Sequence, residues 1–406
     1  MSDLKLAFTY LRTHLLVTVL TVLSVALGLG LATIVLILSS QTKDTLKQET
    51  RYWDIVVGAK GSQLQLILNS MYYLDAPNGN ISTDVWDHLR ANEGIGKIVP
   101  VSVGDNYYGA PIIGTTTDFF TVRQQGATIT SGRMFEKTME VVVGAEVAER
   151  QHLTLGRQIV GSHGWARGGD EHSESPYTVV GILQRTGASM DRALYTDYRS
   201  VWEVHERHQH TGVVDPDEVD TGNNGPEITA LLVQLKQEGR RYQLADDINK
   251  NENAMATIPV DQVDQLVKTF ISPLQGLLLL VAWLVVIVAA LSILISLYLS
   301  LHQRRRDLAV LRALGATQVD IFRMIIIEAA VLTALGVLGG WLLGHGTVAL
   351  LSGYAMQKFG IAPHAWQVQT VELYIGGSVW LLGILAGILP AVVAYRLPVA
   401  ETLIAE

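Results

Sequence analysis

The chain has 406 residues, of which 49% are hydrophobic and only 17% are charged, whereas about 25% charged residues is typical of soluble proteins. The charge is concentrated in one block, because residues 41–270 hold 21 Lys and Arg against 31 Asp and Glu. This pattern excludes an ordinary cytosolic enzyme, a disordered chain and a nucleic-acid-binding protein, which needs a basic face. The sequence has no cysteine, which excludes disulfide scaffolds, thiolate metal sites and cysteine nucleophiles.

The first apolar segment, residues 15–40, contains no charged residue. As a helix it is roughly 39 Å long, which exceeds the ~30 Å hydrocarbon core of a bilayer. A secretory signal has an apolar run of only about 7–15 residues. We therefore predict a retained membrane anchor.

Three further apolar segments predict three more membrane spans, at residues 270–301, 321–351 and 373–395. The third of these four spans contains Arg323 near its start and Glu328 about one turn further on. We expect both side chains to lie near the membrane interface, snorkelling or paired, in preference to an ion pathway.

Basic residues in the short connecting segments predict the orientation. Residues 1–14, 302–320 and 396–406 carry the excess of Lys and Arg, whereas the loop 352–372 contains a single basic residue, Lys358. The three basic segments are therefore predicted to be cytoplasmic. The predicted fold class is an α-helical membrane protein with four transmembrane helices. One large mixed α/β extracytoplasmic (periplasmic) domain, residues 41–269, is inserted between helices 1 and 2. The predicted location is the inner (plasma) membrane.

Local patterns within residues 41–269 predict strands at 140–143 and 177–183 and a helix at 82–92. The flanks 42–51 and 259–267 are polar but helix-compatible, and could prolong the first and second spans beyond the bilayer. Residues 213–226 have the composition of a solvated loop and fail the spacing of a calcium-binding loop.

Motifs for catalysis are absent from the sequence: it contains no G-x-x-x-x-G-K-[ST], no G-x-S-x-G and no H-E-x-x-H. We therefore expect a non-catalytic subunit that does not itself hydrolyse ATP and binds no cofactor of its own.

A histidine cluster stands out in the acidic block. It comprises Glu203, His205, Glu206, His208 and His210, with His152, His163 and His172 upstream. The candidate metal ligands are Glu203, His205, His208 and His210, since imidazole is the commonest metal ligand. A helix brings His205 and His208 to one face but not His210, and a strand brings His208 and His210 together but not His205. Surface histidines are therefore favoured over a zinc or pH-sensing site, and any zinc binding there is expected to be weak.

The segment 302–320 predicts a short amphipathic helix. Leu308, Leu311 and Leu314, with Val310 alongside, are apolar at helical spacing, and Gly315 suits a left-handed C-cap. Thr317 and Asp320 predict a capping box for the next helix. Such a helix either rests on anionic lipid or docks into a cytosolic partner.

Residues 304–332 (RRRDLAVLRALGATQVDIFRMIIIEAAVL) resemble the hallmark of the MacB/FtsX-like permeases, the type VII ABC transporter class. Residues 383–403, 130–156 and 177–187 resemble other motifs of that family, in the same order. The resemblance implies a homodimer that works with a separate cytosolic ATPase, which binds ATP and magnesium. By position, the residues that couple to the ATPase are Arg304, Arg305, Arg306, Leu308, Leu311, Arg312, Leu314 and Gly315, and Glu328 is the acidic residue of the third span.

Three functions are compatible with this resemblance. The first is export or extraction of an amphipathic substrate. The second is a signalling or structural permease that transmits ATP-driven motion to a periplasmic partner protein without transport. The third is a metal-linked system that uses the external histidines. Residues 54–81 match no general family motif and indicate a subgroup.

Overall fold

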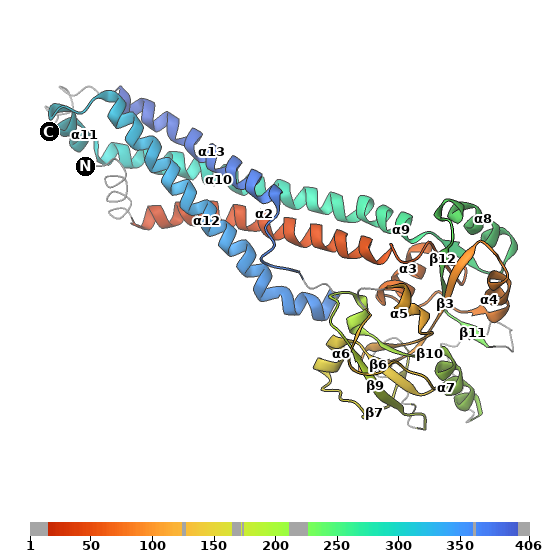
Figure 1. Ribbon diagram of the computed structural model, residues 1–406. Coiled ribbons are helices and arrows are strands. Elements are labelled where there is room, and N and C mark those ends of the chain that lie inside the picture. Colours follow the sequence, from red (N-terminus) through yellow and green to blue (C-terminus); the bar gives the residue numbers. More distant parts are fainter. Residues whose placement is uncertain are drawn as a thin grey trace. The chain divides into compact units, whose positions relative to one another are not determined.

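The structure is a computed structural model that describes residues 15–123, 127–164, 172, 174–210, 226–359 and 363–396, with only the backbone described at residues 17, 205–210 and 356–359. The chain divides into two compact units. The helical unit comprises Met1–Gln41, Phe270–Ala355 and Pro363–Glu406, and the α/β unit comprises Thr42–Thr269 with Met356–Ala362. Figure 1 shows the helices and strands of each unit.

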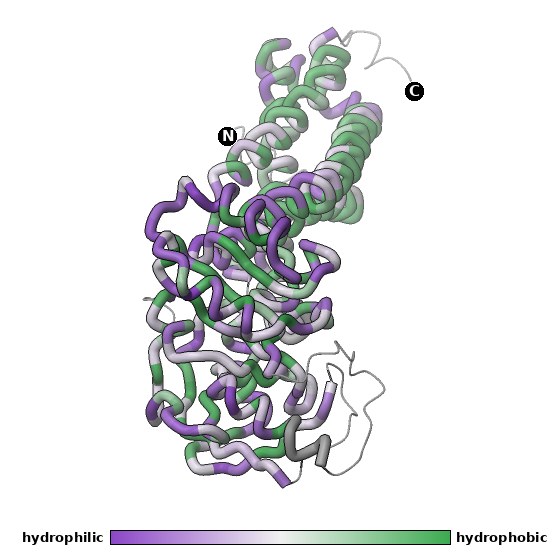
Figure 2. The backbone as a smooth tube through the Cα atoms, turned by 90° about the vertical axis from the view of Figure 1, so that its right-hand side faces the viewer, coloured by the Kyte–Doolittle hydropathy of each residue, from purple (hydrophilic) through white to green (hydrophobic). Residues whose placement is uncertain are grey.

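Four long helices form the described part of the helical unit. They are α2 (Leu15–Glu49), α10 (Ser272–Gln303), α12 (Gln318–Phe359) and α13 (Thr370–Tyr395), and a short helix, α11 (Arg305–Ala313), connects α10 to α12. All four are long and apolar enough to cross a membrane, and Figure 2 shows their mainly hydrophobic composition. The prediction of four apolar helices is confirmed. The membrane boundaries within them stay predictions.

A row of glycines on α12 lets α2 pack unusually close to it. Gly336, Gly340 and Gly344 recur at four-residue spacing and therefore share one face of α12. A Cβ atom at Gly336 would lie 2.6 Å from Val25 Cβ, and one at Gly340 would lie 2.8 Å from Leu29 Cβ. Small residues at such spacing are the usual means by which helices in membranes approach closely.

This close packing predicts that substitutions at two glycines of α12 have very different effects on thermal stability. Gly340→Val should lower the thermal unfolding temperature of the detergent-solubilised protein by several degrees, because overpacking typically costs about 1–3 kcal/mol. Gly346→Val is the matched control, since no atom lies within 4 Å of a Cβ placed there. Equal unfolding temperatures for the two variants would contradict the assigned α2–α12 contact.

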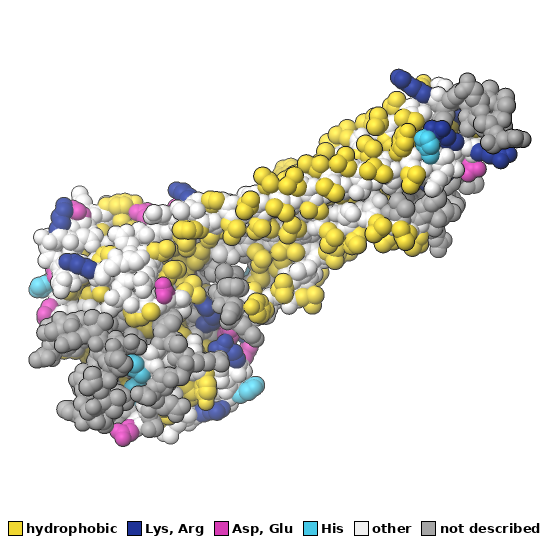
Figure 3. All heavy atoms as spheres, turned by 180° about the vertical axis from the view of Figure 1, so that it is seen from behind, with side chains coloured by type: hydrophobic (Ala, Val, Ile, Leu, Met, Phe, Trp, Pro, Cys, Tyr) yellow, Lys and Arg dark blue, Asp and Glu magenta, His cyan; other side chains and the backbone are white. Residues whose placement is uncertain are grey.

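The outward surface of the helical unit is apolar. Along α10, the side chains of Leu274, Leu277, Leu284, Leu291 and Ile295 are each more than half exposed. Figure 3 shows hydrophobic side chains over much of the visible face of these helices. An exposed apolar surface of this extent is what the hydrocarbon of a bilayer covers.

The α/β unit is built on a mixed sheet. Its strand order is β13 (Met255–Thr257), β1 (Ile55–Gly58), β12 (Ala230–Leu235), β3 (Ile95–Tyr107), β4 (Ala110–Thr115), β10 (Leu194–Asp197), β6 (Glu140–Val143), β9 (Tyr177–Leu183) and β5 (Ile129–Gly132). The short strands β7 (Gln158–Ile159) and β8 (Ser162–His163) pair with β9 and β3. The pairs β4–β10 and β6–β9 are parallel, and the other pairs are antiparallel.

The long strand β3 joins two hydrophobic cores in this unit. Its first half pairs with β12, and its second half pairs with β4. One core gathers residues such as Ile55, Trp86 and Leu231, and the other gathers Ile112, Val141 and Tyr177. The described helices of the unit are α3 (Gln63–Tyr72), α4 (Thr83–Arg90), α5 (Asp118–Val122), α6 (Ala145–Arg150), α7 (Tyr198–His210), α8 (Arg241–Asn251) and α9 (Pro259–Leu266).

The local predictions in this unit agree with the structure. The strands predicted at 140–143 and 177–183 are β6 and β9, and the helix predicted at 82–92 is α4, with the Ser82 hydroxyl as its N-cap. The two flanks are helical: α2 continues to Glu49, and α9 continues through a π-turn (Val267–Ile271) into α10. Their role as extensions beyond the bilayer stays a prediction. Most of the loop predicted at 213–226 lies outside the described residues.

Candidate functional site

Helix α11 has a sharply defined end. The backbone N–H of Ala316 donates to Leu311 O at 3.1 Å and that of Gly315 donates to Arg312 O at 3.1 Å, which is the Schellman pattern. Gly315 has φ = +108°, a region that favours glycine. The predicted capping box follows, because the Asp320 N–H donates to Thr317 Oγ1 and the Thr317 N–H donates to Asp320 Oδ2. Both local predictions are therefore confirmed.

The two faces of α11 differ in exposure. Leu308 is buried in the hydrophobic core of the helical unit, Leu311 packs against that core, and Ala309 is also buried. Leu314 is 81% exposed and Val310 is 44% exposed. With the exposed Arg306 they form a row at four-residue spacing, which we call the docking face (Arg306, Val310 and Leu314). The predicted apolar stripe is thus divided between an inward and an outward side.

The other basic residues of the predicted coupling segment also differ. Arg305 and Arg312 are half-buried, and Arg304 is only 8% exposed. Arg304 Nη1 and Nη2 donate to the two carboxylate oxygens of Glu328 at 3.3 and 3.2 Å. The pair joins the start of α11 to α12, and it confirms that the acidic residue of the third span is paired.

The ion pair predicts a characteristic pattern of stability. Glu328→Ala should destabilise the protein strongly, by about 3–5 kcal/mol, because it leaves a buried guanidinium without its carboxylate. The double variant Arg304→Met/Glu328→Leu should recover most of that loss, since it removes both charges. Thermal unfolding in detergent measures both effects. A double variant as unstable as the single one would show that the pair is not the source of the effect.

A second buried polar pair links α12 to α13. His345 is fully buried, and its Nε2 lies 2.8 Å from Glu372 Oε2. The other ring nitrogen of His345 contacts the carbonyl of Ala365. Glu372 also accepts from the Gln369 N–H in the capping box of α13. The sequence analysis missed this pair, because its members are separated by a loop of no recognisable pattern.

Helix α2 is anchored at its end within the α/β unit. The last residue of α2, Glu49, pairs with Arg123 at 3.0 Å, and both side chains are at most 5% exposed. The guanidinium of Arg123 also lies 4.4 Å from the ring centre of Phe119. Lys47 on α2 pairs with Asp264 on α9 at 2.8 Å. The two helices that continue from this unit into the helical unit are therefore tied to each other and to the sheet region.

The electrostatic surroundings of this anchor follow from burial. Burial raises the pKa of Glu49, and the charge of Arg123 opposes that effect. Burial also raises the pKa of Tyr73 to about 12. Tyr72, next to Tyr73, donates its hydroxyl to Leu46 O at 2.5 Å. The end of α2 thus lies in a buried polar cluster next to aromatic side chains.

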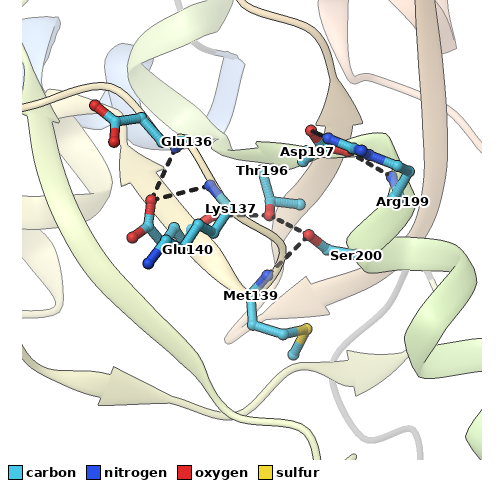
Figure 4. Close-up of polar contacts among 8 residues, drawn as sticks. All are labelled: Glu136, Lys137, Met139, Glu140, Thr196, Asp197, Arg199 and Ser200. Atoms are coloured by element: carbon cyan, nitrogen blue, oxygen red, sulfur yellow. Dashed lines mark hydrogen bonds and ion pairs between the residues drawn. The ribbon is translucent and has the colours of Figure 1, made fainter.

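One segment of the family-like motif at 130–156 has a structural explanation (Figure 4). Glu140 accepts hydrogen bonds from the backbone N–H groups of Glu136 and Lys137 at 2.8 and 3.3 Å. The Arg133 guanidinium lowers the pKa of Glu140 to about 2. The Thr196 hydroxyl donates to the Glu140 carbonyl oxygen at 2.8 Å. These contacts close the turn before β6 and fix that strand beside β10.

The histidines of the predicted cluster have different positions. His205, His208 and His210 lie on α7, so the helix rule applies, but their side chains are outside the described residues, as is that of Glu206. Glu203 on the same helix is half-buried, and His152 is exposed. The metal role predicted for Glu203, His205, His208 and His210 stays a prediction.

Two upstream histidines converge on an acidic residue that the sequence analysis did not identify. Asp105, His163 and His172 offer ligand atoms that all lie within 4.8 Å of one another. His172 Nε2 lies 3.1 Å and His163 Nδ1 lies 3.7 Å from the same oxygen, Asp105 Oδ1. The side chains of Asp105 and His172 are buried, and that of His163 is 26% exposed. This group could hold a metal ion.

Tyr177 lies beside this group. Its side chain is fully buried, and its hydroxyl has no hydrogen-bond partner in the described part of the chain. Burial raises the pKa of Tyr177, and the charges of Asp105 and Glu203 raise it further.

Comparison with protein families accounts for most of the sequence. Residues 18–251 match the MacB-like periplasmic core domain, and residues 279–403 match the FtsX-like permease C-terminal domain. The chain belongs to the MacB/FtsX-like ABC transporter permease family. Most of the α/β unit lies within the match to the MacB-like periplasmic core domain, and α11 lies within the match to the FtsX-like permease C-terminal domain.

Individual relatives agree with this family. The chain is 23% identical to the uncharacterized ABC transporter permease YknZ of Bacillus subtilis, over 99% of this chain and 98% of the relative. It is 24% identical to the macrolide export ATP-binding/permease protein MacB of Wolinella succinogenes, over 99% of this chain and 60% of the relative. MacB of Escherichia coli is also 24% identical, over 100% of this chain and 61% of the relative. The chain thus spans about 60% of the length of these MacB proteins.

Two solved structures are also similar in part. The extracellular domain of YknZ aligns with a TM-score of 0.31 and 14% identity, covering 50% of this chain and 98% of that chain. The periplasmic region of MacB from Actinobacillus actinomycetemcomitans aligns with a TM-score of 0.34 and 13% identity, covering 55% of this chain and 97% of that chain.

Proposed function

We propose that this chain is the permease subunit of an ABC transporter and couples ATP hydrolysis by a separate cytosolic ATPase to movement of its periplasmic domain. Two copies of the chain would form the membrane part. The movement serves export or extraction of an amphipathic substrate, as the name of the MacB relatives states for macrolides. A permease that drives an envelope partner without transport is the alternative, and both share the coupling steps below.

The observation that carries this proposal is the construction of α11. Its inward side is fixed by Leu308 in the core and by the Arg304–Glu328 pair, whereas the docking face is left exposed. A helix held so firmly on one side transmits a force applied to its other side. Apolar side chains beside an arginine are suited to a groove on a partner protein.

The path of the force follows from contacts inside each unit. From α11 it passes to α12 through Arg304 and Glu328, and from α12 to α2 through the glycine face. Helix α2 is continuous to Glu49, where Arg123 anchors it in the α/β unit. This arrangement supports mechanical transmission along α2 in preference to a substrate tunnel through the bilayer.

The orientation proposed for this mechanism places α11 in the cytoplasm and the α/β unit in the periplasm, with the four helices in the inner membrane. The arginines at and within α11, Arg304, Arg305, Arg306 and Arg312, support it through the positive-inside rule. The cytosolic ATPase would meet the docking face on that side.

The exposure of the docking face predicts that a substitution there affects ATPase binding without affecting folding stability. Leu314→Asp should abolish co-purification with the ATPase, because an unpaired carboxylate is costly to bury in an apolar groove. The unfolding temperature should stay unchanged, since Leu314 is already exposed. Leu308→Asp is the contrast, and should instead lower the unfolding temperature. If Leu314→Asp retains stoichiometric ATPase binding and full activity, the docking assignment is wrong.

The orientation is tested by labelling. The native sequence contains no cysteine, so single cysteines at the exposed positions Glu238 and Gln303 give a clean background. In intact spheroplasts, a membrane-impermeant maleimide should react with the cysteine at position 238. The cysteine at position 303 should react only after lysis. The reverse pattern would overturn the orientation.

A further inference from the structure

The group formed by Asp105, His163 and His172 has no role in the proposed coupling mechanism. It lies wholly within the α/β unit. Asp105 is on β3, His163 is on β8, and His172 follows β8 in the chain. We infer that these three side chains form a binding site for a divalent transition-metal ion of the zinc type. This site does not include the α7 histidines. The proposal of a metal site does not depend on the proposed coupling function.

The backbone places the three side chains together. Asp105 and His163 are directly opposite each other in the antiparallel pair β3–β8, so their side chains lie on the same face. A β-bulge on β3 between Val103 and Asp105 shifts the register next to the site. Bulges commonly redirect a side chain at functional sites.

His172 is positioned by backbone hydrogen bonds. Its N–H donates to Gly161 O at 2.9 Å, and its carbonyl oxygen accepts from the Ser175 N–H at 3.0 Å. The Asn106 amide donates to Gly164 O at 2.8 Å, which secures the chain after β8. The donor atoms are thus held by the fold and do not depend on long, mobile side chains.

The spacing of the donor atoms suits a small metal ion. Zinc binds nitrogen and oxygen ligands at about 2.0–2.2 Å, so neighbouring ligands of a tetrahedral ion are about 3.3 Å apart. The two imidazole nitrogens lie 3.1 and 3.7 Å from Asp105 Oδ1, and the whole set lies within 4.8 Å. Small side-chain movements therefore suffice to close the three donors around an ion.

The donor types select the class of metal. Two imidazoles and one carboxylate suit zinc and its transition-metal neighbours, whereas calcium and magnesium require mainly oxygen ligands. Three protein ligands leave the fourth position of a tetrahedral zinc ion for water or another ligand. The side chain of His163 is partly exposed, whereas those of Asp105 and His172 are buried.

A buried hydrogen bond between His172 and Asp105 is the simpler explanation of that pair. It does not require a second imidazole beside the same oxygen, yet His163 Nδ1 lies 3.7 Å from Asp105 Oδ1. Nor does it account for Tyr177, whose buried hydroxyl lacks a hydrogen-bond partner among the described residues. A Cβ atom at Gly161 would lie 3.7 Å from both Asp105 Cβ and Tyr177 Cε2, so both side chains lie around Gly161.

The test uses the full-length protein in detergent, purified without a polyhistidine tag, stripped with a chelator and titrated with zinc chloride alone. Competition with a chromophoric zinc chelator measures affinity and stoichiometry. We expect one zinc ion per chain, and His163→Asn and His172→Asn should each weaken binding by at least about 10-fold, the lower end of the loss seen even for outer-shell partners. His152→Asn is the matched control, because His152 is exposed and its φ of +51° is one that asparagine tolerates.

A second measurement tests whether a loss of zinc binding reflects misfolding of the variant. Zinc should raise the unfolding temperature of the wild-type protein but not that of His163→Asn, the variant at the partly exposed ligand, whose unfolding temperature without zinc should match that of the wild type. Unchanged affinity in both His163→Asn and His172→Asn would overturn the proposal. Loss of binding only in a His205→Asn/His208→Asn/His210→Asn variant would also overturn it and assign the metal to α7. Association of His163→Asn with the ATPase should be normal, so this result is independent of the coupling test.

Discussion

The buried ion pair between Arg304 and Glu328 is the constraint on which the α11 end of the helical unit depends. A charged group at such depth is tolerated only when it is paired, and the bidentate geometry fixes both the distance and the rotation of the two helices. Because Arg304 and Leu308 are four residues apart, pairing of the arginine also directs the leucine into the core. Leu314, six residues after Leu308, lies about 120° away around the helix and is exposed.

The same rigidity continues along α2. A helix of 35 residues is about 52 Å long, and it transmits displacement only if both ends are held. Contact with the glycine face of α12 holds one part of α2, where the missing Cβ atoms bring backbone against backbone. The Glu49–Arg123 and Lys47–Asp264 pairs hold the end in the α/β unit. Removing Arg123 would leave a carboxylate buried among aromatic rings, so the anchor is expected to tolerate little change.

Local features of this protein could be predicted from its sequence. The apolar helices, the Thr317–Asp320 capping box, the Gly315 C-cap and the strands β6 and β9 each depend on residues close together in the chain. Residues that meet through the tertiary fold could not be predicted. Asp105 is 67 residues from His172, and nothing in the sequence marks it among the acidic residues of the block. The apolar residues of α11 were recognised, but their pattern could not show that Leu308 faces inward while Leu314 faces outward.

The histidines illustrate the same limit in a way that bears on function. Sequence density directed attention to α7, yet a helix brings only His205 and His208 to one face and leaves His210 on another. Strand pairing, in contrast, can bring a single histidine opposite a single aspartate and fix both, as β8 and β3 do with His163 and Asp105. Because the chain has no thiolate to offer, a metal site in it must be built from imidazole and carboxylate groups. With three such ligands and one open position, the ion at Asp105 would remain exchangeable, which suits a site that receives or releases metal more than one that only stabilises the fold.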